Sequence, residues 1–266
     1  MNISSLRIAL SALCIGLSVG LPLAVSTASA ADMDATTDAN TFETRLPNGM
    51  KVVVREDHRA PTAVQMVWYR VGSMDEHDGV TGVAHVTEHM MFKGTPSVGP
   101  GEFNRRVAAV GGRDNAFTST DYTAYFQQVP ANQLKTVMAL EADRMRHLTL
   151  DPAGYSKEIQ VVMEERRMRT DDQSTARLHE AMNAVAWQAH PYRRPIIGWM
   201  GDLEQMTVQD IRDWYRRWYV PNNATLVVVG DVNHAQVFAW ARDTYGRIPA
   251  RSLGERKQYE EPVQTG

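Results

Sequence analysis

The chain has 266 residues and a formal net charge of −3 at pH 7, which argues against nucleic acid or an anionic membrane surface as a partner. Its hydrophobic content of 43% and charged content of 22% are those of a soluble globular protein. Beyond an N-terminal targeting segment, the remaining residues are enough for one well-buried domain.

Residues 1–30 have the pattern of a secretory signal peptide. Arg7 gives a weakly positive start, an apolar run follows at 8–25, and residues 28–30 form an Ala-Ser-Ala cleavage signal. A retained membrane anchor is the alternative, but the run is short for a span and contains Pro22. We therefore expect a secreted protein, in a bacterial periplasm, with no stable membrane anchor after cleavage.

The single cysteine of the sequence, Cys14, lies within this N-terminal segment. The expected mature chain therefore has no disulfide and no thiolate to bind a metal. Any zinc site in the mature chain must use histidine and carboxylate side chains.

Strands and helices are interspersed along the expected mature chain. Residues 41–56 form a predicted hairpin, because Asn48-Gly49 between two strand-like runs is a strong turn signal. Further strands are expected where β-branched and aromatic residues concentrate, at 63–71, 115–129 and 225–229. Helices are expected at 82–92, 101–110, 131–147, 154–169, 207–219 and 234–245. This order favours an α+β fold over strict β-α alternation.

The C-terminal residues, from about 250 onwards, are polar and charged, without apolar periodicity. Such a segment is typical of a linker or a loose terminus. We therefore expect three parts: a signal peptide at 1–30, one domain at 31–250 and a linker-like tail at 251–266. The tail is expected either to fray as a terminus or to be a linker whose second domain is absent from this sequence.

The sharpest motif is His85-Val86-Thr87-Glu88-His89, within the predicted helix at 82–92. Positions i, i+3 and i+4 share one face of a helix, so both imidazoles and the Glu88 carboxylate point the same way. Two histidines one turn apart can bind a single zinc ion, and Glu88 is placed to take a proton from metal-bound water. The pattern is the inverse of the H-E-x-x-H arrangement. Taken alone, it also arises by coincidence.

A catalytic zinc site needs a third protein ligand and an open position for water. The predicted helix at 154–169 offers Glu158, Glu164 and Glu165. By helical spacing, Glu158 and Glu165 interrupt an apolar stripe, whereas Glu164 lies on a face expected to meet solvent. The apolar members of the stripe are Val161, Val162 and Met168.

A carboxylate within an apolar stripe needs a partner, because burying an unpaired charge is costly. Zinc is one such partner, and an arginine is an equal alternative on spacing alone. The arginines considered are Arg105, Arg106, Arg166 and Arg169.

The remaining histidines have no partner at ligand spacing, so we expect ordinary surface or packing roles for them. They are His58, His77, His147, His179, His190 and His234. The stretch 115–129 is rich in Thr, Ser and Tyr, which suits an exposed strand that binds an extended peptide. A plain interior strand is an equal interpretation.

Several motifs resemble those of the pitrilysin/insulysin family of inverted zinc metallopeptidases, most closely its mitochondrial-processing-peptidase branch. The resemblance runs from about residue 42 to residue 250, which is nearly the whole expected domain. The matching segments occur in the family's order, at 46–49, 82–95, 111–118, 121–123, 161–165, 190–191 and 227–231.

The resemblance implies a mostly antiparallel sheet covered by helices, forming one half of a two-domain clamshell. It implies zinc as the cofactor, bound by His85, His89 and a third ligand 76 residues after His89, which is Glu165. It makes Glu158 a carboxylate that orients the site. The substrate-binding edge that it implies is Asn115, Ala116, Phe117 and Thr118.

The expected activity is that of a zinc-dependent endopeptidase acting on peptides or short unfolded proteins, with Glu88 as the base that activates a zinc-bound water. The family's usual second domain or subunit is an expected partner. Two alternatives stay open: a non-catalytic partner subunit of a heterodimeric peptidase, and a metal-binding protein without hydrolase activity. The intact set of His85, Glu88, His89 and Glu165 argues against the first alternative, and Glu88 is unexplained by the second.

Overall fold

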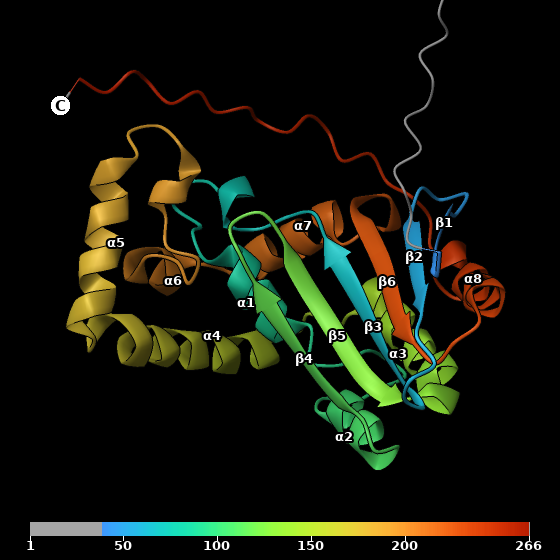
Figure 1. The fold of residues 1–266 in the computed structure, drawn as a ribbon. Helices are drawn as coiled ribbons and strands as arrows, with labels where there is room; N and C mark the ends of the chain where they lie inside the picture. The colour runs from blue at the N-terminus through green and yellow to red at the C-terminus, as the bar shows by residue number, and fades with distance from the viewer. Residues whose placement is uncertain (1–38, 266) are drawn as a thin grey trace, which may run out of the picture. The chain divides into compact units, whose positions relative to one another are not determined.

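The computed structural model describes residues 39–265 (Figure 1). The predicted signal peptide at 1–30 lies outside the described residues and stays a prediction. Within 39–265, none of the helices has the length and apolar character needed to cross a membrane.

A six-stranded sheet forms the centre of the fold, in the order β1-β2-β6-β3-β5-β4 (Figure 1). Neighbouring strands are antiparallel except for β2 and β6, which run parallel. The mixed α and β content and the mostly antiparallel sheet confirm the expected fold class. The strands are β1 Thr41–Arg45, β2 Lys51–Glu56, β3 Thr62–Tyr69, β4 Arg113–Thr118, β5 Thr123–Pro130 and β6 Ala224–Gly230.

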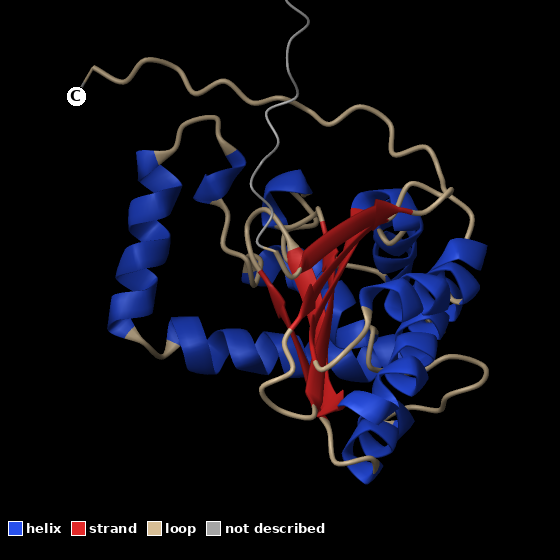
Figure 2. Cartoon of the chain, turned by 45° about the vertical axis from the view of Figure 1, so that its right-hand side comes forward, coloured by secondary structure: helices blue, strands red, loops and turns tan. Residues whose placement is uncertain are grey.

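Helices pack against one face of this sheet (Figure 2). Along β3 and β6 buried residues alternate with half-exposed ones, so one face of each strand joins the core and the other stays partly open. The helices are α1 Val83–Met90, α2 Glu102–Ala109, α3 Leu134–His147, α4 Pro152–Arg166, α5 Ser174–Ala186, α6 Met200–Gln205, α7 Val208–Trp218 and α8 His234–Asp243.

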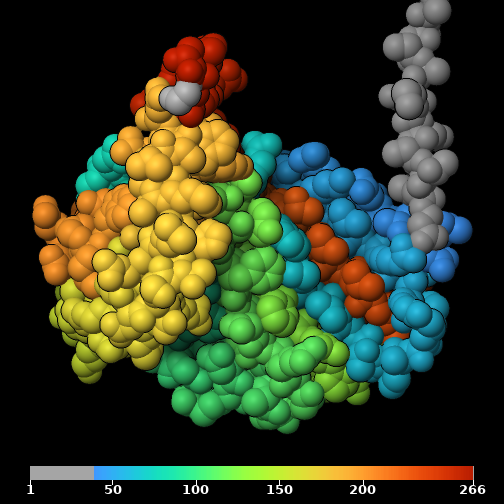
Figure 3. Space-filling model, turned by 60° about the vertical axis from the view of Figure 1, so that its left-hand side comes forward, coloured from blue at the N-terminus to red at the C-terminus, as the bar shows by residue number. Residues whose placement is uncertain are grey.

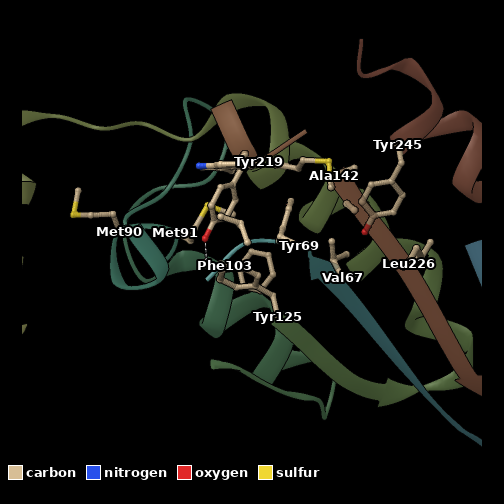
Figure 4. Close-up of a cluster of buried hydrophobic side chains, with 14 of the residues drawn as sticks. Val67, Tyr69, Met90, Met91, Phe103, Tyr125, Ala142, Tyr219, Leu226 and Tyr245 are labelled. Atoms are coloured by element: carbon tan, nitrogen blue, oxygen red, sulfur yellow. Dashed lines mark hydrogen bonds between the residues drawn. The ribbon is translucent and has the colours of Figure 1, made fainter. Parts of the chain in front are cut away.

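The core beneath α1 is built from tyrosine rings and methionines (Figure 4). Tyr69, Tyr125 and Tyr219 are buried and pack ring against ring, and the hydroxyls of Tyr125 and Tyr219 are 3.0 Å apart. Met90 and Met91, at the end of α1, are buried. This packing fixes which face of α1 turns away from the core.

The prediction of one strand at 115–129 was wrong, because a turn divides this stretch. The backbone N–H of Ser119 donates to the carbonyl of Tyr122 at 2.8 Å, which joins β4 to β5 as a hairpin. The polar residues that suggested an exposed strand include the turn itself. β4 lies at the edge of the sheet, whereas β5 is interior.

Two helices, α5 and α6, were not predicted. α5 has no buried residue, although Leu178, Met182 and Val185 recur at the i, i+4 and i+7 spacing of one helix face, so an apolar stripe was overlooked there. α6 has only 6 residues, too few for periodicity to be read. The helix expected at 154–169 ends at Arg166 and continues as a π-helical turn, Arg167–Asp171.

Residues 251–265 contain no helix or strand, as their composition indicated. The segment is nevertheless attached to the domain at several points, two of which involve Arg256 and Glu261. Arg256 donates to Asp75 at 2.7 Å and lies over the ring of Trp218. The Glu261 carboxylate accepts hydrogen bonds from the backbone N–H groups of residues 188–190, at 2.6–3.0 Å. The segment 251–265 therefore runs from the sheet side of the molecule towards α5 (Figure 1).

Candidate metal centre

Helix α1 has one face in the core and one face on a cavity. Val83, Val86 and Met90 are buried among the sheet and helices. His85 and Glu88 lie on the opposite face with His89, one turn apart and only partly buried. The helical periodicity that placed these three side chains together is thus observed, and the buried face holds the helix in this orientation.

His85, His89 and Glu165 each offer one ligand atom within 4.8 Å of the others. The distance from Glu165 Oε2 is 3.3 Å to His89 Nε2 and 3.8 Å to His85 Nε2. Both imidazoles therefore turn the same nitrogen towards one carboxylate oxygen. Within residues 39–265, this is the one group of three such side chains close enough to hold an ion.

The protonation of His85 fits a metal ligand. Burial, together with the nearby His89 and Arg169, lowers the pKa of His85 to about 3, so its imidazole is neutral and keeps a lone pair for a ligand. His85 Nδ1 is buried and has no hydrogen-bond partner. Two imidazole nitrogens and one carboxylate oxygen, without a thiolate, are a donor set that zinc accepts at sites where one position is left for water.

Glu158 contacts His89 on the side of its ring that faces away from Glu165. One of its oxygens lies 2.9 Å from His89 Nδ1, and the other pairs with the ammonium of Lys93. Burial opposes ionisation of Glu158, but the hydrogen bonds from His89 and Lys93 outweigh it and lower the pKa of the carboxyl. With Nδ1 engaged in this way, Nε2 is the atom of His89 that faces Glu165. Lys93 was not singled out from the sequence.

Of the arginines considered as alternative partners, only Arg169 contacts Glu165 among the described residues. Its guanidinium is 2.8 Å from Glu165 Oε1, whereas Oε2 faces the histidines. The sequence left open whether the partner of Glu165 is an arginine or a metal bound with histidines, and Glu165 lies beside both Arg169 and the two histidines. Glu164 is exposed and pairs with Arg167, as expected for the solvent face.

The apolar stripe predicted on α4 was only partly correct. Val162 is fully buried, but Val161 is 51% exposed and Met168 is 56% exposed. α1 covers only part of α4, so the two exposed side chains open onto the cavity instead of entering the core. One part of the predicted stripe, Val162, thus packs in the core, and the other part, Val161 and Met168, lines the cavity.

The Glu88 carboxylate lies on the same cavity as the histidines. The Thr118 hydroxyl, on β4, donates to Glu88 Oε2 at 2.5 Å. Burial raises the pKa of Glu88, and the hydrogen bond from Thr118 works against that rise. Thr118 was expected at the substrate edge, and no sequence pattern indicates its contact with Glu88, because 30 residues separate the two.

The cavity has a volume of about 1060 Å³ and extends from the histidines along β4 to α5. Asn115, Ala116 and Phe117 line it from β4, together with Val161 and Met168 from the opposite side. Figure 3 shows α4 and α5 beside β4 on one face of the molecule. The cavity therefore joins the predicted metal ligands to the predicted substrate edge.

The family model described as insulinase, peptidase family M16, matches residues 51–199, more than half of the chain. The chain belongs to this family. A second model, described as the peptidase M16 inactive domain, matches residues 205–266. The resemblance inferred from the motifs is thereby confirmed.

The relatives of this M16 chain include named zinc proteases. The zinc protease PqqE of Helicobacter pylori is 36% identical over 226 residues, which cover 83% of this chain and 50% of that protein. The mitochondrial-processing peptidase subunit beta of Blastocladiella emersonii is 28% identical over 223 residues, covering 84% of this chain and 47% of that protein. The chain thus spans about half the length of these relatives.

Solved structures give the same result for the fold. A protease from Helicobacter pylori superposes with a TM-score of 0.81 at 34% identity, covering 84% of this chain and 54% of the other. The first half of the periplasmic protease PqqL from Escherichia coli gives a TM-score of 0.78 at 28% identity, covering 85% and 50%. The fold is that of one half of an M16 protease.

Proposed function

We propose that this chain is the catalytic half of a zinc-dependent endopeptidase that hydrolyses peptides and short unfolded proteins. The observation that carries the proposal is the convergence of His85, His89 and Glu165 beside Glu88 on one open cavity. Membership of M16, whose relatives are named zinc proteases, supports a protease-like function independently.

In this proposal, His85, His89 and Glu165 bind zinc, and Glu158 orients the imidazole of His89. Zinc held there would polarise the scissile carbonyl and lower the pKa of its water. Glu88, on the same cavity, would act as the base that accepts the proton of the attacking water and returns it to the leaving amine.

The substrate edge in this proposal is β4, at residues 115–118. β4 is the outermost strand of its side of the sheet, so its outer backbone groups can pair with an extended peptide. Thr118, at the end of the strand, contacts Glu88, which puts the peptide path beside the base.

A second homologous domain or subunit is part of the proposal. The chain spans about half the length of PqqE and matches the first half of PqqL. One face of β3 and β6 stays half-exposed, although it carries Met66, Trp68 and Val227. Such a face is suited to a partner that closes over the cavity.

A periplasmic location is proposed from two observations. Residues 1–30 have a signal-peptide pattern, and a structural relative, PqqL, is named as a periplasmic protease. Detection of the processed chain in a periplasmic extract tests this part of the proposal.

A non-catalytic partner subunit is the second candidate, favoured by the match of residues 205–266 to the inactive-domain model. The four residues of the proposed centre lie outside that match, in the region that matches the insulinase model. A metal-binding protein without hydrolase activity is the third candidate. Under it, Glu88→Gln leaves the function intact.

The test is hydrolysis of a mixed set of quenched, unstructured peptides by the purified protein with zinc supplied. Glu88→Gln and a chelator are the controls. Cleavage that both controls abolish supports the peptidase. Absence of cleavage with one zinc bound per chain supports a half-enzyme that needs its second half, whereas absence of both cleavage and zinc contradicts the metal centre.

A further inference from the structure

Glu76 is a carboxylate buried behind the proposed metal centre, with 1% of its surface exposed. Its Oε2 accepts a hydrogen bond from the backbone N–H of Gly82, and its Oε1 accepts one from Ala84, each at 2.9 Å. Gly82 precedes α1, and Ala84 directly precedes His85. The two bonds therefore attach Glu76 to the first turn of the helix that carries the site.

The residue at the N-cap of α1 is Gly82, which has no side chain to accept a hydrogen bond from the first N–H groups of the helix. Gly82 has a φ of +89°, and a Cβ there would lie 2.6 Å from the carbonyl oxygen of Ile197. A Cβ on Gly198 would lie 2.4 Å from the carbonyl oxygen of Thr81. The two backbone segments cross so closely that neither glycine can carry a side chain, so the capping oxygens must come from elsewhere. Glu76 supplies them.

The segment that carries Glu76 is itself fixed by other elements. Arg194 donates to the carbonyl oxygen of Glu76 at 2.7 Å. Asp202, on α6, accepts from the backbone N–H of Thr81 at 3.0 Å and from its hydroxyl at 2.5 Å. The backbone around Glu76 is thus held in place, so its carboxyl is a fixed acceptor for the first N–H groups of α1.

α1 has only 8 residues, so few backbone hydrogen bonds hold it as a helix. The first N–H groups of any helix lack partners within it, so acceptor oxygens placed at that end stabilise the first turn. If these N–H groups lose their acceptor, the first turn frays before the rest. His85 stands in that turn, whereas His89 lies one turn further on.

We infer that Glu76 is a positioning residue for the metal centre: it fixes the first turn of α1 and thereby the direction of the His85 imidazole. The inference rests on the proposed function, in which His85 binds zinc. It adds a residue that touches neither metal nor substrate and lies outside the cavity.

The test is Glu76→Gln at pH 9, above the Glu76 pKa of about 8, where the carboxylate offers two acceptor oxygens and the amide of the same size offers one. Amide hydrogen exchange of residues 83–90 is measured on metal-free protein, and zinc affinity by competition with a chelator. We expect faster exchange at Ala84 and His85 and a zinc affinity lower by about tenfold or more, as for other residues that orient ligands.

Glu141→Gln is the matched control. Glu141 is also fully buried, but its carboxylate bonds to Gln127 and Arg144 and to no residue of α1. This variant should lose stability while its zinc affinity stays within about twofold of wild type, because ligand orientation is unaffected. A merely structural role for Glu76 predicts the same behaviour for both variants.

Two failures are distinguishable. Unchanged exchange in α1, or wild-type zinc affinity in Glu76→Gln, overturns the positioning role and leaves the proposed function standing. If the wild-type protein itself binds no zinc, the metal centre is overturned, and with it the role of Glu76 towards the metal.

Discussion

Thr118 on β4 donates its hydroxyl hydrogen to Glu88 on α1, over 2.5 Å. The bond links the strand proposed to hold the peptide to the carboxylate proposed to take the proton of water. It also favours the ionised form of Glu88, in which the carboxylate can act as a base. One side chain thus affects both the place and the protonation of the proposed base.

Replacing Thr118 by valine removes this hydrogen bond with little change in shape. We expect kcat to fall roughly tenfold, since hydrogen bonds to charged groups contribute about 1.5–3 kcal/mol. Loss of the bond raises the pKa of Glu88 further, so the acid limb of the pH–activity profile should move to higher pH. Rates measured across pH test both effects.

Thr118→Ser is the control for that variant, because it keeps the hydroxyl and removes only a methyl group. It should restore most of the rate and the position of the acid limb. A valine variant with an unshifted acid limb would show that the contact has no influence on the base.

Glu158→Gln tests the support behind His89. The neutral amide holds the imidazole and Lys93 less strongly than the carboxylate does. We expect zinc affinity to fall by about 10- to 100-fold, the usual effect of losing such a partner. Glu164→Gln, on the exposed face of the same helix, is the matched control and should bind zinc as the wild type does.

The pH dependence of stability tests Glu76 separately. Burial raises the pKa of this carboxyl from 4.5 to about 8, although two backbone N–H groups oppose the rise. Between these values the folded chain binds a proton that the unfolded chain has released, so this group's contribution to stability falls as pH rises. Glutamine does not titrate. The difference in unfolding free energy between wild type and Glu76→Gln should therefore narrow from pH 5 to pH 9, as measured by urea unfolding of metal-free protein.

A difference that stays constant with pH would mean that Glu76 keeps an ordinary pKa in the folded chain. A difference that widens with pH would mean that the two N–H groups outweigh burial and lower the pKa. The measurement thus determines the sign of the shift as well as its presence.

The sequence was informative wherever a pattern is local. The spacing of His85, Glu88 and His89 places them on one helix face, and Asn48-Gly49 marks a turn between two strands, as the structure shows. These patterns depend on the geometry of a single element, so no tertiary contact is needed to read them.

Features that depend on contacts between distant elements could not be predicted. Thr118 meets Glu88 only because the β4–β5 hairpin folds beside α1, and the turn in that hairpin was itself missed. The role of Lys93 depends on α4 lying across the end of α1. Glu76 was not singled out, because nothing in its sequence neighbourhood shows that a close backbone crossing requires a glycine at the helix start.

The exposed helix α5 shows a different limit. Leu178, Met182 and Val185 are 68%, 49% and 79% exposed, so apolar residues on this helix do not mark a core face. Their i, i+4 and i+7 spacing is that of a helix face, but within the described residues none of this helix is fully buried, so the pattern predicts the helix and not where it packs.

His85, His89 and Glu165 are proposed to form a zinc site, and the zinc content of the purified protein decides whether they do. Metal analysis of wild type, Glu88→Gln and a His85→Ala/His89→Ala double variant is the measurement. We expect one zinc per chain in the first two proteins, because Glu88 is not a proposed ligand, and none in the double variant. A wild type that binds no zinc, or a double variant that keeps a full equivalent, would contradict the proposed zinc site.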